Sequence, residues 1–127
     1  MAGQTILLAE DDDMVRSFVR SVLEGCGHRV LPAGNGVEAL QLAKRVGPHR
    51  IDLVLTDVDM PALNGVQLVR CLKQLRSDLK VLFMTGHRSV LELELRDKGM
   101  VIEKPFACAT LLRGVDACLA EEPIAPQ

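Results

Sequence analysis

The stretch IDLVLTD, residues 51–57, decides the fold of this chain, because it is a short and almost continuous apolar run that ends in an aspartate. A run of about four to eight such residues is typical of a strand buried on both faces of a sheet. We therefore expect a strand over Ile51–Thr56, with Asp57 at its carboxyl end. Similar runs predict four further strands, at Thr5–Ala9, His28–Leu31, Leu79–Met84 and Met100–Glu103.

Segments with a helical spacing of apolar residues lie between these runs. Asp12 or Asp13 supplies a cap for the first helix, and Pro32 is expected to stop the second strand. Ser89–Asp97 alternates with the period of a strand, but its place between two strands favours a short helix, because parallel strands need a crossover. Five strands alternating with helices predict an α/β fold, an open parallel sheet with helices on both faces. The helix residues expected in the core are Val15, Val19 and Leu23, with Met14, Phe18 and Val22, then Val37, Leu40 and Val46, then Val66, Val69, Leu72 and Leu75, and finally Leu111, Leu112, Val115 and Leu119.

The composition limits the classes of protein to which the chain can belong. Its 127 residues suit one domain, and 48% apolar residues suffice for a core. Three Phe, no Tyr and no Trp imply an aliphatic core, and together with a net charge of −2 they argue against direct nucleic-acid binding. We expect a cytoplasmic domain without membrane contact, because no apolar run reaches the roughly 18 residues of a spanning helix and no signal peptide is recognisable. The four cysteines lack zinc-ligand spacing and predict reduced, packed thiols.

Acidic residues follow the first and third predicted strands. Open parallel sheets gather functional groups at the carboxyl ends of their strands, where Glu10 and Asp11 follow one strand and Asp57 follows another. Carboxylates that converge there would bind a hard divalent cation such as Mg²⁺, which would keep Asp57 ionised and nucleophilic. The alternative is structural, with helix capping by the acidic run and an aspartate turn at Asp57.

A hydroxyl and a lysine follow the fourth and fifth predicted strands. Thr85 precedes a glycine and has a hydroxyl that can donate to an anionic oxygen. Lys104 precedes Pro105, in a peptide bond expected to be cis, and near the acids it would contact a phosphoryl group as a point charge; alone it is a surface lysine. An aspartate, a cation, a hydroxyl and a lysine together meet the needs of an acyl phosphate, because phosphoryl transfer depends on positioning and charge stabilisation.

In this combination the chain resembles the receiver (phosphoacceptor) domain of two-component response regulators. The matching stretches are ILLAEDD, LVLTDVDMPALNG, VLFMTG and EKPF, and the resemblance covers about residues 4–120. The spacings of 46 residues from Asp11 to Asp57, 28 to Thr85 and 19 to Lys104 also fit. The resemblance implies a flavodoxin-like, doubly wound (βα)5 fold with strand order 2-1-3-4-5, a receiver over residues 1–121, and a disordered tail or linker over 122–127.

The resemblance also implies a role for each site residue. Asp57 would take a phosphoryl group from the phosphohistidine of a histidine kinase or histidine phosphotransfer domain, and the domain would slowly hydrolyse it. Asp57 and Asp11 would bind Mg²⁺, or Mn²⁺ in its place, with Glu10 acting through a water. The backbone carbonyl of Asp59 would be a further ligand. Thr85 and Lys104 would bind the phosphoryl oxygens.

The chain departs from the family pattern at Val101, where many receivers carry a Tyr or Phe that turns inward on phosphorylation. Asp59 and His87 flank the site at variable positions and would tune hydrolysis, and His87 would add a dependence on pH near neutrality. The last two helices and the fifth strand would serve self-association, as they often do in the family. The N-terminal segment and the EKPF region resemble most the C-terminal receivers of hybrid sensor histidine kinases. The chain would then belong to a longer kinase, and the alternative is a free-standing response regulator.

Two other classes of function fit part of the pattern. Asp57 and Asp59 form a DxD like the nucleophile motif of haloacid-dehalogenase-like phosphohydrolases, but there the motif follows the first strand of a larger chain. A degenerate receiver would serve only as a docking module, which the complete set of acids, Thr85 and Lys104 disfavours. No glycine-rich loop ending in GK[ST] supports nucleotide binding.

Overall fold

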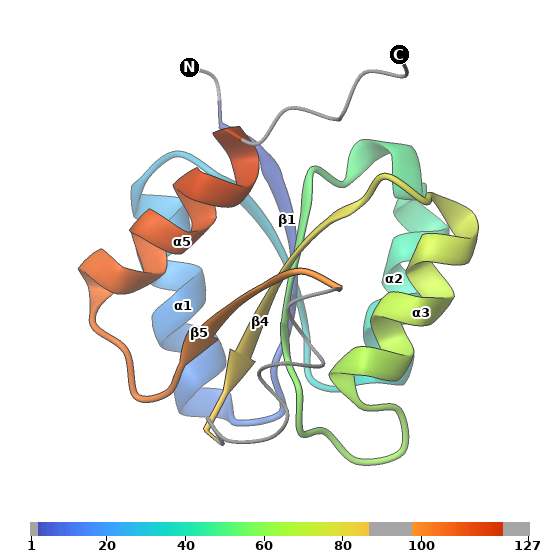
Figure 1. Cartoon of the computed structure of the whole chain (residues 1–127), viewed down its shortest axis with the longest axis horizontal. Coiled ribbons are helices and arrows are strands. Elements are labelled where there is room, and N and C mark those ends of the chain that lie inside the picture. Colours follow the sequence, from blue (N-terminus) through green and yellow to red (C-terminus); the bar gives the residue numbers. More distant parts are fainter. Residues whose placement is uncertain (1–2, 87–97, 121–127) are drawn as a thin grey trace.

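The computed structural model describes residues 3–86 and 98–120. Strands and helices alternate along this part of the chain, with one short 3-10 helix before the third strand (Figure 1). The elements are β1 (Thr5–Ala9), α1 (Asp13–Gly25), β2 (Arg29–Ala33), α2 (Gly36–Val46), η1 (Pro48–Arg50), β3 (Leu53–Asp57), α3 (Gly65–Leu75), β4 (Lys80–Thr85), β5 (Met100–Glu103) and α5 (Cys108–Ala120). None of the helices in the described residues is both long enough and apolar enough to cross a membrane.

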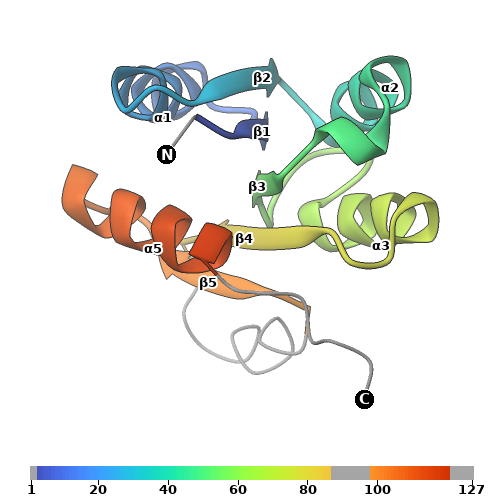
Figure 2. The same ribbon diagram turned by 90° about the horizontal axis from the view of Figure 1, so that it is seen from above.

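The sheet is parallel, with the order β2-β1-β3-β4-β5, which confirms the predicted doubly wound fold. The chain adds β2 on one side of β1 and then returns to add β3 on the other side. Because crossovers are right-handed, this reversal places helices on opposite faces of the sheet. Figure 2 shows α1 and α5 on one face and α2 and α3 on the other. The reversal point lies between β1 and β3, where open α/β sheets place their ligand sites.

The strands β1, β3 and β4 are buried on both faces, so the core consists of two apolar layers. Leu7, Val54 and Phe83 belong to the layer under α2 and α3. Ile6 and Leu82 alternate with them along the strands and belong to the layer under α1 and α5. Burial on both faces explains why these strands read as continuous apolar runs rather than as alternating ones.

Side-chain caps fix where the helices begin. Asp12 caps α1, since its Oδ1 accepts the amides of Met14 at 2.9 Å and Val15 at 3.0 Å; this resolves the choice between Asp12 and Asp13. Asn35 caps α2 by accepting the amide of Glu38 at 2.8 Å. The Asn64 and Gln67 side chains form a reciprocal capping box at the start of α3.

The prediction that Pro32 ends the second strand is wrong, because β2 continues to Ala33. β2 is an edge strand of this sheet, where a residue without an N–H is tolerated. The predicted core face of α2 is confirmed only in part: Leu40 packs against the core, but Val37 is 44% exposed, whereas Ala39 and Ala43 are fully buried. The predicted face selected the large apolar residues, but the small ones let this helix lie close to the sheet.

The remaining helix and cysteine predictions are confirmed in part. In α1, Val19 and Leu23 are buried, whereas Met14 is 84% exposed and Phe18 is 43% exposed. Among the four free cysteines only Cys118 is buried, so packing does not explain the exposed ones. The predicted helix over residues 89–97 lies outside the described residues.

Candidate functional site

The carboxyl ends of β1 and β3 bring the predicted acids together. The two strands are neighbours; Glu10 follows the last residue of β1, and Asp57 is the last residue of β3. Carboxylate oxygens of Glu10, Asp11 and Asp57 lie within 4.8 Å of one another. Glu10 and Asp57 are buried and Asp11 is exposed, so solvent and solutes reach the cluster from the side of Asp11.

Lys104 reaches the same cluster from the end of β5. Its Nζ donates to Oδ2 of Asp57 at 3.1 Å and to Oε1 of Glu10. The backbone amide of Lys104 donates to the carbonyl of Thr85 at 2.8 Å, which carries the pairing of β4 and β5 one residue further. The bond from Lys104 to Pro105 is cis, as predicted. One ammonium group therefore bridges two carboxylates that come from separate strands.

The backbone around Asp57 is held by close contacts. Oδ1 of Asp57 accepts the amide of Asp59 at 3.2 Å, and the amide of Val58 donates to the carbonyl of Met84 at 3.0 Å. Gly65, the first residue of α3, donates its amide to the carbonyl of Val58 at 2.9 Å. A Cβ at Gly65 would lie 2.2 Å from the carbonyl oxygen of Asp57, so only glycine fits at that position.

Burial dominates the electrostatics of Glu10 and raises the pKa of its carboxyl to about 7. The hydrogen bond from Lys104 and the one from the Asp12 amide oppose this rise, while the charge of Asp57 adds to it. For Lys104, burial lowers the pKa of the ammonium, but the bond to Glu10 and the charges of Asp57 and Glu10 outweigh it, so this pKa is raised. The ammonium of Lys104 stays charged at neutral pH.

The donor set fits a hard divalent cation. Three carboxylates converge and Lys104 supplies one positive charge, so the negative charge exceeds the positive charge at the site. Burial is the main cause of the raised pKa of Glu10, and the charge of Asp57 adds to it. Oxygen ligands of this kind, from one or two carboxylates with waters, are those that Mg²⁺ prefers.

The other predicted residues lie at or beside the cluster. Thr85 is the last residue of β4 and is 1% exposed, one position beyond the register partner of Asp57. Asp59 lies at the site, where its backbone amide donates a hydrogen bond to Oδ1 of Asp57. Val101 is half-buried on β5 opposite Phe83 and packs against the apolar layer under α2 and α3. His87 lies outside the described residues.

Comparison with known proteins identifies the family. The family model of the response regulator receiver domain matches residues 6–116. The chain belongs to this family. Its function is therefore that of a receiver in phosphorelay signalling, and the group of Glu10, Asp11, Asp57 and Lys104 is consistent with a phosphoacceptor site.

Individual receivers show how this domain is used in other proteins. The chain is 33% identical to the response regulator receiver protein CpdR of Brucella abortus, covering 90% of this chain and 95% of CpdR. It is also 33% identical to the sensor kinase CckA of the same organism, covering 93% of this chain and only 13% of CckA. A receiver domain thus accounts for nearly all of one relative and a small part of the other.

Solved structures agree with the fold and with the character of the site. The chemotaxis protein CheY4 of Vibrio cholerae matches with a TM-score of 0.83 and 28% identity, covering 93% of this chain and 100% of that one. The receiver domain of the sensor histidine kinase PA1611 of Pseudomonas aeruginosa matches with a TM-score of 0.82 and 27% identity, covering 94% and 100%. That receiver has a magnesium ion coordinated in its active-site cleft.

The geometry also bears on the hydrolase alternative. In this sheet the DxD of Asp57 and Asp59 stands at the end of β3, and a separate acid pair follows β1. The motif is therefore not at the first strand, where that class of hydrolase carries it. Two further residues contribute to the site although the sequence patterns did not single them out, Gly65 and Arg16. Arg16 lies six residues after Glu10 and donates to its backbone carbonyl, and a basic residue soon after an acidic run was the available signal.

Proposed function

We propose that Asp57 accepts a phosphoryl group from a phosphohistidine. A carboxylate oxygen of Asp57 forms a bond to phosphorus as the bond between phosphorus and the histidine nitrogen breaks, and the histidine leaves as neutral imidazole after taking up a proton. Hydrolysis of the acyl phosphate by water then regenerates the carboxylate and releases inorganic phosphate. The observation that carries this proposal is the convergence of Asp57, two further acids and Lys104 at one edge of the sheet.

The residues of the chain would position the reacting groups and stabilise charge. Lys104 already contacts Oδ2 of Asp57 and would follow the added negative charge on the phosphoryl oxygens. The Thr85 hydroxyl, at the end of the neighbouring strand, would donate to another of these oxygens. The amide of Asp59 holds Oδ1 of Asp57 and thereby the orientation of the carboxylate.

A divalent cation completes the proposed site. Asp11, Asp57 and the backbone carbonyl of Asp59 would hold Mg²⁺, or Mn²⁺ in its place, with Glu10 acting through a water. When bound, the cation would neutralise part of the charge that builds up on the transferred group. The donor set and the magnesium ion of the Pseudomonas receiver support this assignment.

The partner would be a histidine kinase or a histidine phosphotransfer domain, which must bring its histidine to Asp57. Met14 and Phe18 are exposed apolar side chains of α1, and the half-buried Phe106 lies beside Phe18. Phe106 follows Lys104 by two residues, and its ring lies 6.5 Å from that of Phe18 on α1. Met14 on the same helix is 84% exposed. We place the docking surface for the partner on Met14, Phe18 and Phe106.

The finer assignments are part of the proposal. The receiver spans residues 1–121 and residues 122–127 form a tail or linker. The parent is a hybrid sensor histidine kinase, for which the identity to CckA is the support, or a free-standing regulator, which the coverage of CpdR supports. The coding sequence on either side of the chain distinguishes the two. A cytoplasmic location agrees with four cysteines that form no disulfide.

The test is the intact mass of the native chain after incubation with acetyl phosphate and Mg²⁺. We expect the native chain to gain one phosphoryl group. We expect no gain when EDTA is added before the donor, and none in Asp57→Asn. Asp116→Asn is a matched control, because Asp116 is exposed on α5 and should leave the gain intact. A gain in Asp57→Asn equal to the native gain would contradict the proposal, as would no gain from either acetyl phosphate or a phosphohistidine donor.

A further inference from the structure

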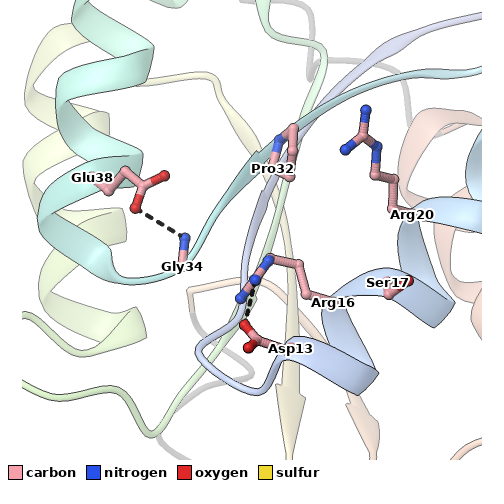
Figure 3. Close-up of a pocket in the computed structure, with 7 residues that line it drawn as sticks. All are labelled: Asp13, Arg16, Ser17, Arg20, Pro32, Gly34 and Glu38. Carbon is pink, nitrogen blue, oxygen red and sulfur yellow. Dashed lines mark hydrogen bonds and ion pairs between the residues drawn. The ribbon is translucent and has the colours of Figure 1, made fainter.

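Arg16 ties the acidic turn, residues 10–13, to helix α1. Its Nη1 donates to the backbone carbonyl of Glu10 at 2.9 Å, and its Nη2 forms an ion pair with Oδ1 of Asp13. Figure 3 shows this ion pair and the guanidinium of Arg16 turned back toward the turn. The side chain of Arg16 is only 25% exposed although it lies on a surface helix. The two anchor points lie on either side of Asp11 in the sequence.

The rest of the acidic turn is held by short-range bonds that converge on the same segment. Oε2 of Glu10 accepts the amide of Asp12 at 3.0 Å, and Asp12 in turn caps α1. These bonds fix the two ends of the turn to each other. Arg16 adds a link between Glu10, which precedes the exposed Asp11, and Asp13, the first residue of α1. Among the described residues no such bond holds the Asp11 side chain, so its position beside Asp57 depends on this frame.

We propose that Arg16 is a positioning residue for the metal ligand Asp11. The proposal rests on the proposed function, because it assumes a divalent cation at Asp11 and Asp57. A guanidinium is a planar fork whose donors reach two acceptors in a fixed geometry, whereas the ammonium of lysine is a point charge on a flexible stem. Arg16 would thus position Asp11 indirectly, because its two-pronged guanidinium holds Glu10 and Asp13 on either side, and not through its charge. Outer groups that orient metal ligands commonly affect metal affinity by about 10- to 100-fold.

The charge of Arg16 and its guanidinium fork should have opposite effects on Mg²⁺ affinity, so variants can separate the two. A positive charge beside the cluster repels a cation, so its removal alone would strengthen binding of Mg²⁺. Loss of the fork would weaken binding whether or not the charge is kept. Arg16→Lys keeps the charge and loses the fork, and Arg16→Met loses both.

Arg20 offers a matched control on the same helix. Arg16 and Arg20 line one pocket of about 410 Å³, with Asp13, Ser17, Pro32, Gly34 and Glu38. Arg20 instead pairs with Glu24, at 3.2 Å between Nε and Oε2. Arg20→Lys therefore makes the same change of side chain in the same pocket without touching the frame of the acidic turn.

The experiment is calorimetric titration of the native chain and the three variants with MgCl₂. We expect Arg16→Lys and Arg16→Met to weaken binding about 10-fold and Arg20→Lys to leave it unchanged. Tighter binding in Arg16→Met, or native affinity in Arg16→Lys, overturns the positioning role. No binding of Mg²⁺ to the native chain overturns the proposed metal site instead, so the two failures are distinguishable.

Amide exchange in the metal-free variants provides a second readout, which a general loss of stability would not imitate. We expect the amide of Asp12 to exchange faster in Arg16→Lys, while the amide of Gly65 on the far side of the cluster keeps its native rate. Equal acceleration of both amides would assign Arg16 a general structural role and overturn the proposal. The thermal midpoint of each variant without Mg²⁺ establishes that the chain is folded.

Discussion

Lys104 and Asp57, which lie 47 residues apart in the sequence, meet through a 3.1 Å contact between Nζ and Oδ2. The same Nζ also contacts Glu10, whose side chain is fully buried. The ammonium is thus the cation that lets two buried carboxylates share the edge of the sheet. The lysine that we propose contacts the phosphoryl group therefore also contributes to the stability of the metal-free fold.

The first prediction concerns Lys104→Met. We expect the free energy of unfolding without Mg²⁺ to fall by about 2 kcal/mol, because the change leaves two carboxylates without their counter-charge in a largely buried site. Saturating Mg²⁺ should recover part of this loss. Urea unfolding with and without Mg²⁺ measures both, and Lys44→Met, at an exposed position on α2, is the control. An unchanged stability in Lys104→Met would show that the ion pair is not formed in solution.

The second prediction concerns pH and Glu10. Its pKa of about 7 in the folded chain lies above the ordinary value of 4.5, so between these values the folded state holds a proton that the unfolded state has lost. Without metal, the free energy of unfolding should therefore fall as pH rises from 4.5 to 7, by at most about 3 kcal/mol, and then level off. Urea unfolding over this range measures the slope. Glu10→Gln should remove this part of the slope, and an identical slope in that variant would assign it to other groups.

Much of the site can be predicted from the sequence because the carboxyl ends of all strands in a parallel sheet lie along the same edge. Once β1, β3 and β4 are recognised as strands, the residues at their carboxyl ends lie along one edge. The proximity of Glu10, Asp57 and Thr85 follows from that alone. The direct bond from Lys104 to Glu10 does not follow. It depends on the burial of Glu10, which is set by the packing of elements distant in sequence.

The errors in the fold have the same origin. Local sequence rules predict that Pro32 ends a strand, yet β2 continues through it. A proline is tolerated there because β2 is an edge strand, and its place at the edge is known only from the sheet topology. Ala39 and Ala43 carry a weaker hydrophobic signal than Val37, yet their small volume suits them to the contact with the sheet. Local patterns give the identity of these elements, whereas the face and the exact ends depend on the neighbours.

The third prediction concerns Gly65→Ala. The added Cβ would lie 2.2 Å from the carbonyl oxygen of Asp57, so the backbone that carries the phosphoacceptor must shift. We expect a loss of about 1–3 kcal/mol in the free energy of unfolding and slower phosphorylation by acetyl phosphate. Gly25→Ala is the control, because a Cβ at Gly25, the last residue of α1, meets nothing within 4 Å. Thermal unfolding and intact mass against time measure the two effects. A native rate and stability in Gly65→Ala would mean that the loop yields without cost.

The fourth prediction concerns Val101→Ala. Val101 lies on β5 beside the core and does not belong to the acidic cluster, so phosphorylation by acetyl phosphate should stay within about twofold of native, at a cost of about 1 kcal/mol in stability. Thr85→Ala, at the neighbouring strand end, should in contrast slow the reaction by about tenfold or more. Intact mass against time compares the two. Strong slowing in Val101→Ala would reveal a link between this position and the site.

The fifth prediction concerns the docking surface. Phe18→Ala should lower the efficiency of phosphotransfer from a phosphorylated histidine phosphotransfer domain by about tenfold, because truncation of a central interface aromatic typically costs 1–2 kcal/mol or more. Its rate with acetyl phosphate should stay native, since Phe18 does not belong to the acidic cluster. Leu75→Ala removes a similarly exposed apolar side chain, 48% exposed on α3 at the opposite face of the sheet, and should affect neither reaction. Rapid-quench measurements with both donors separate docking from chemistry. Equal slowing of Phe18→Ala with the two donors would assign Phe18 to the fold of the site and move the partner to another face.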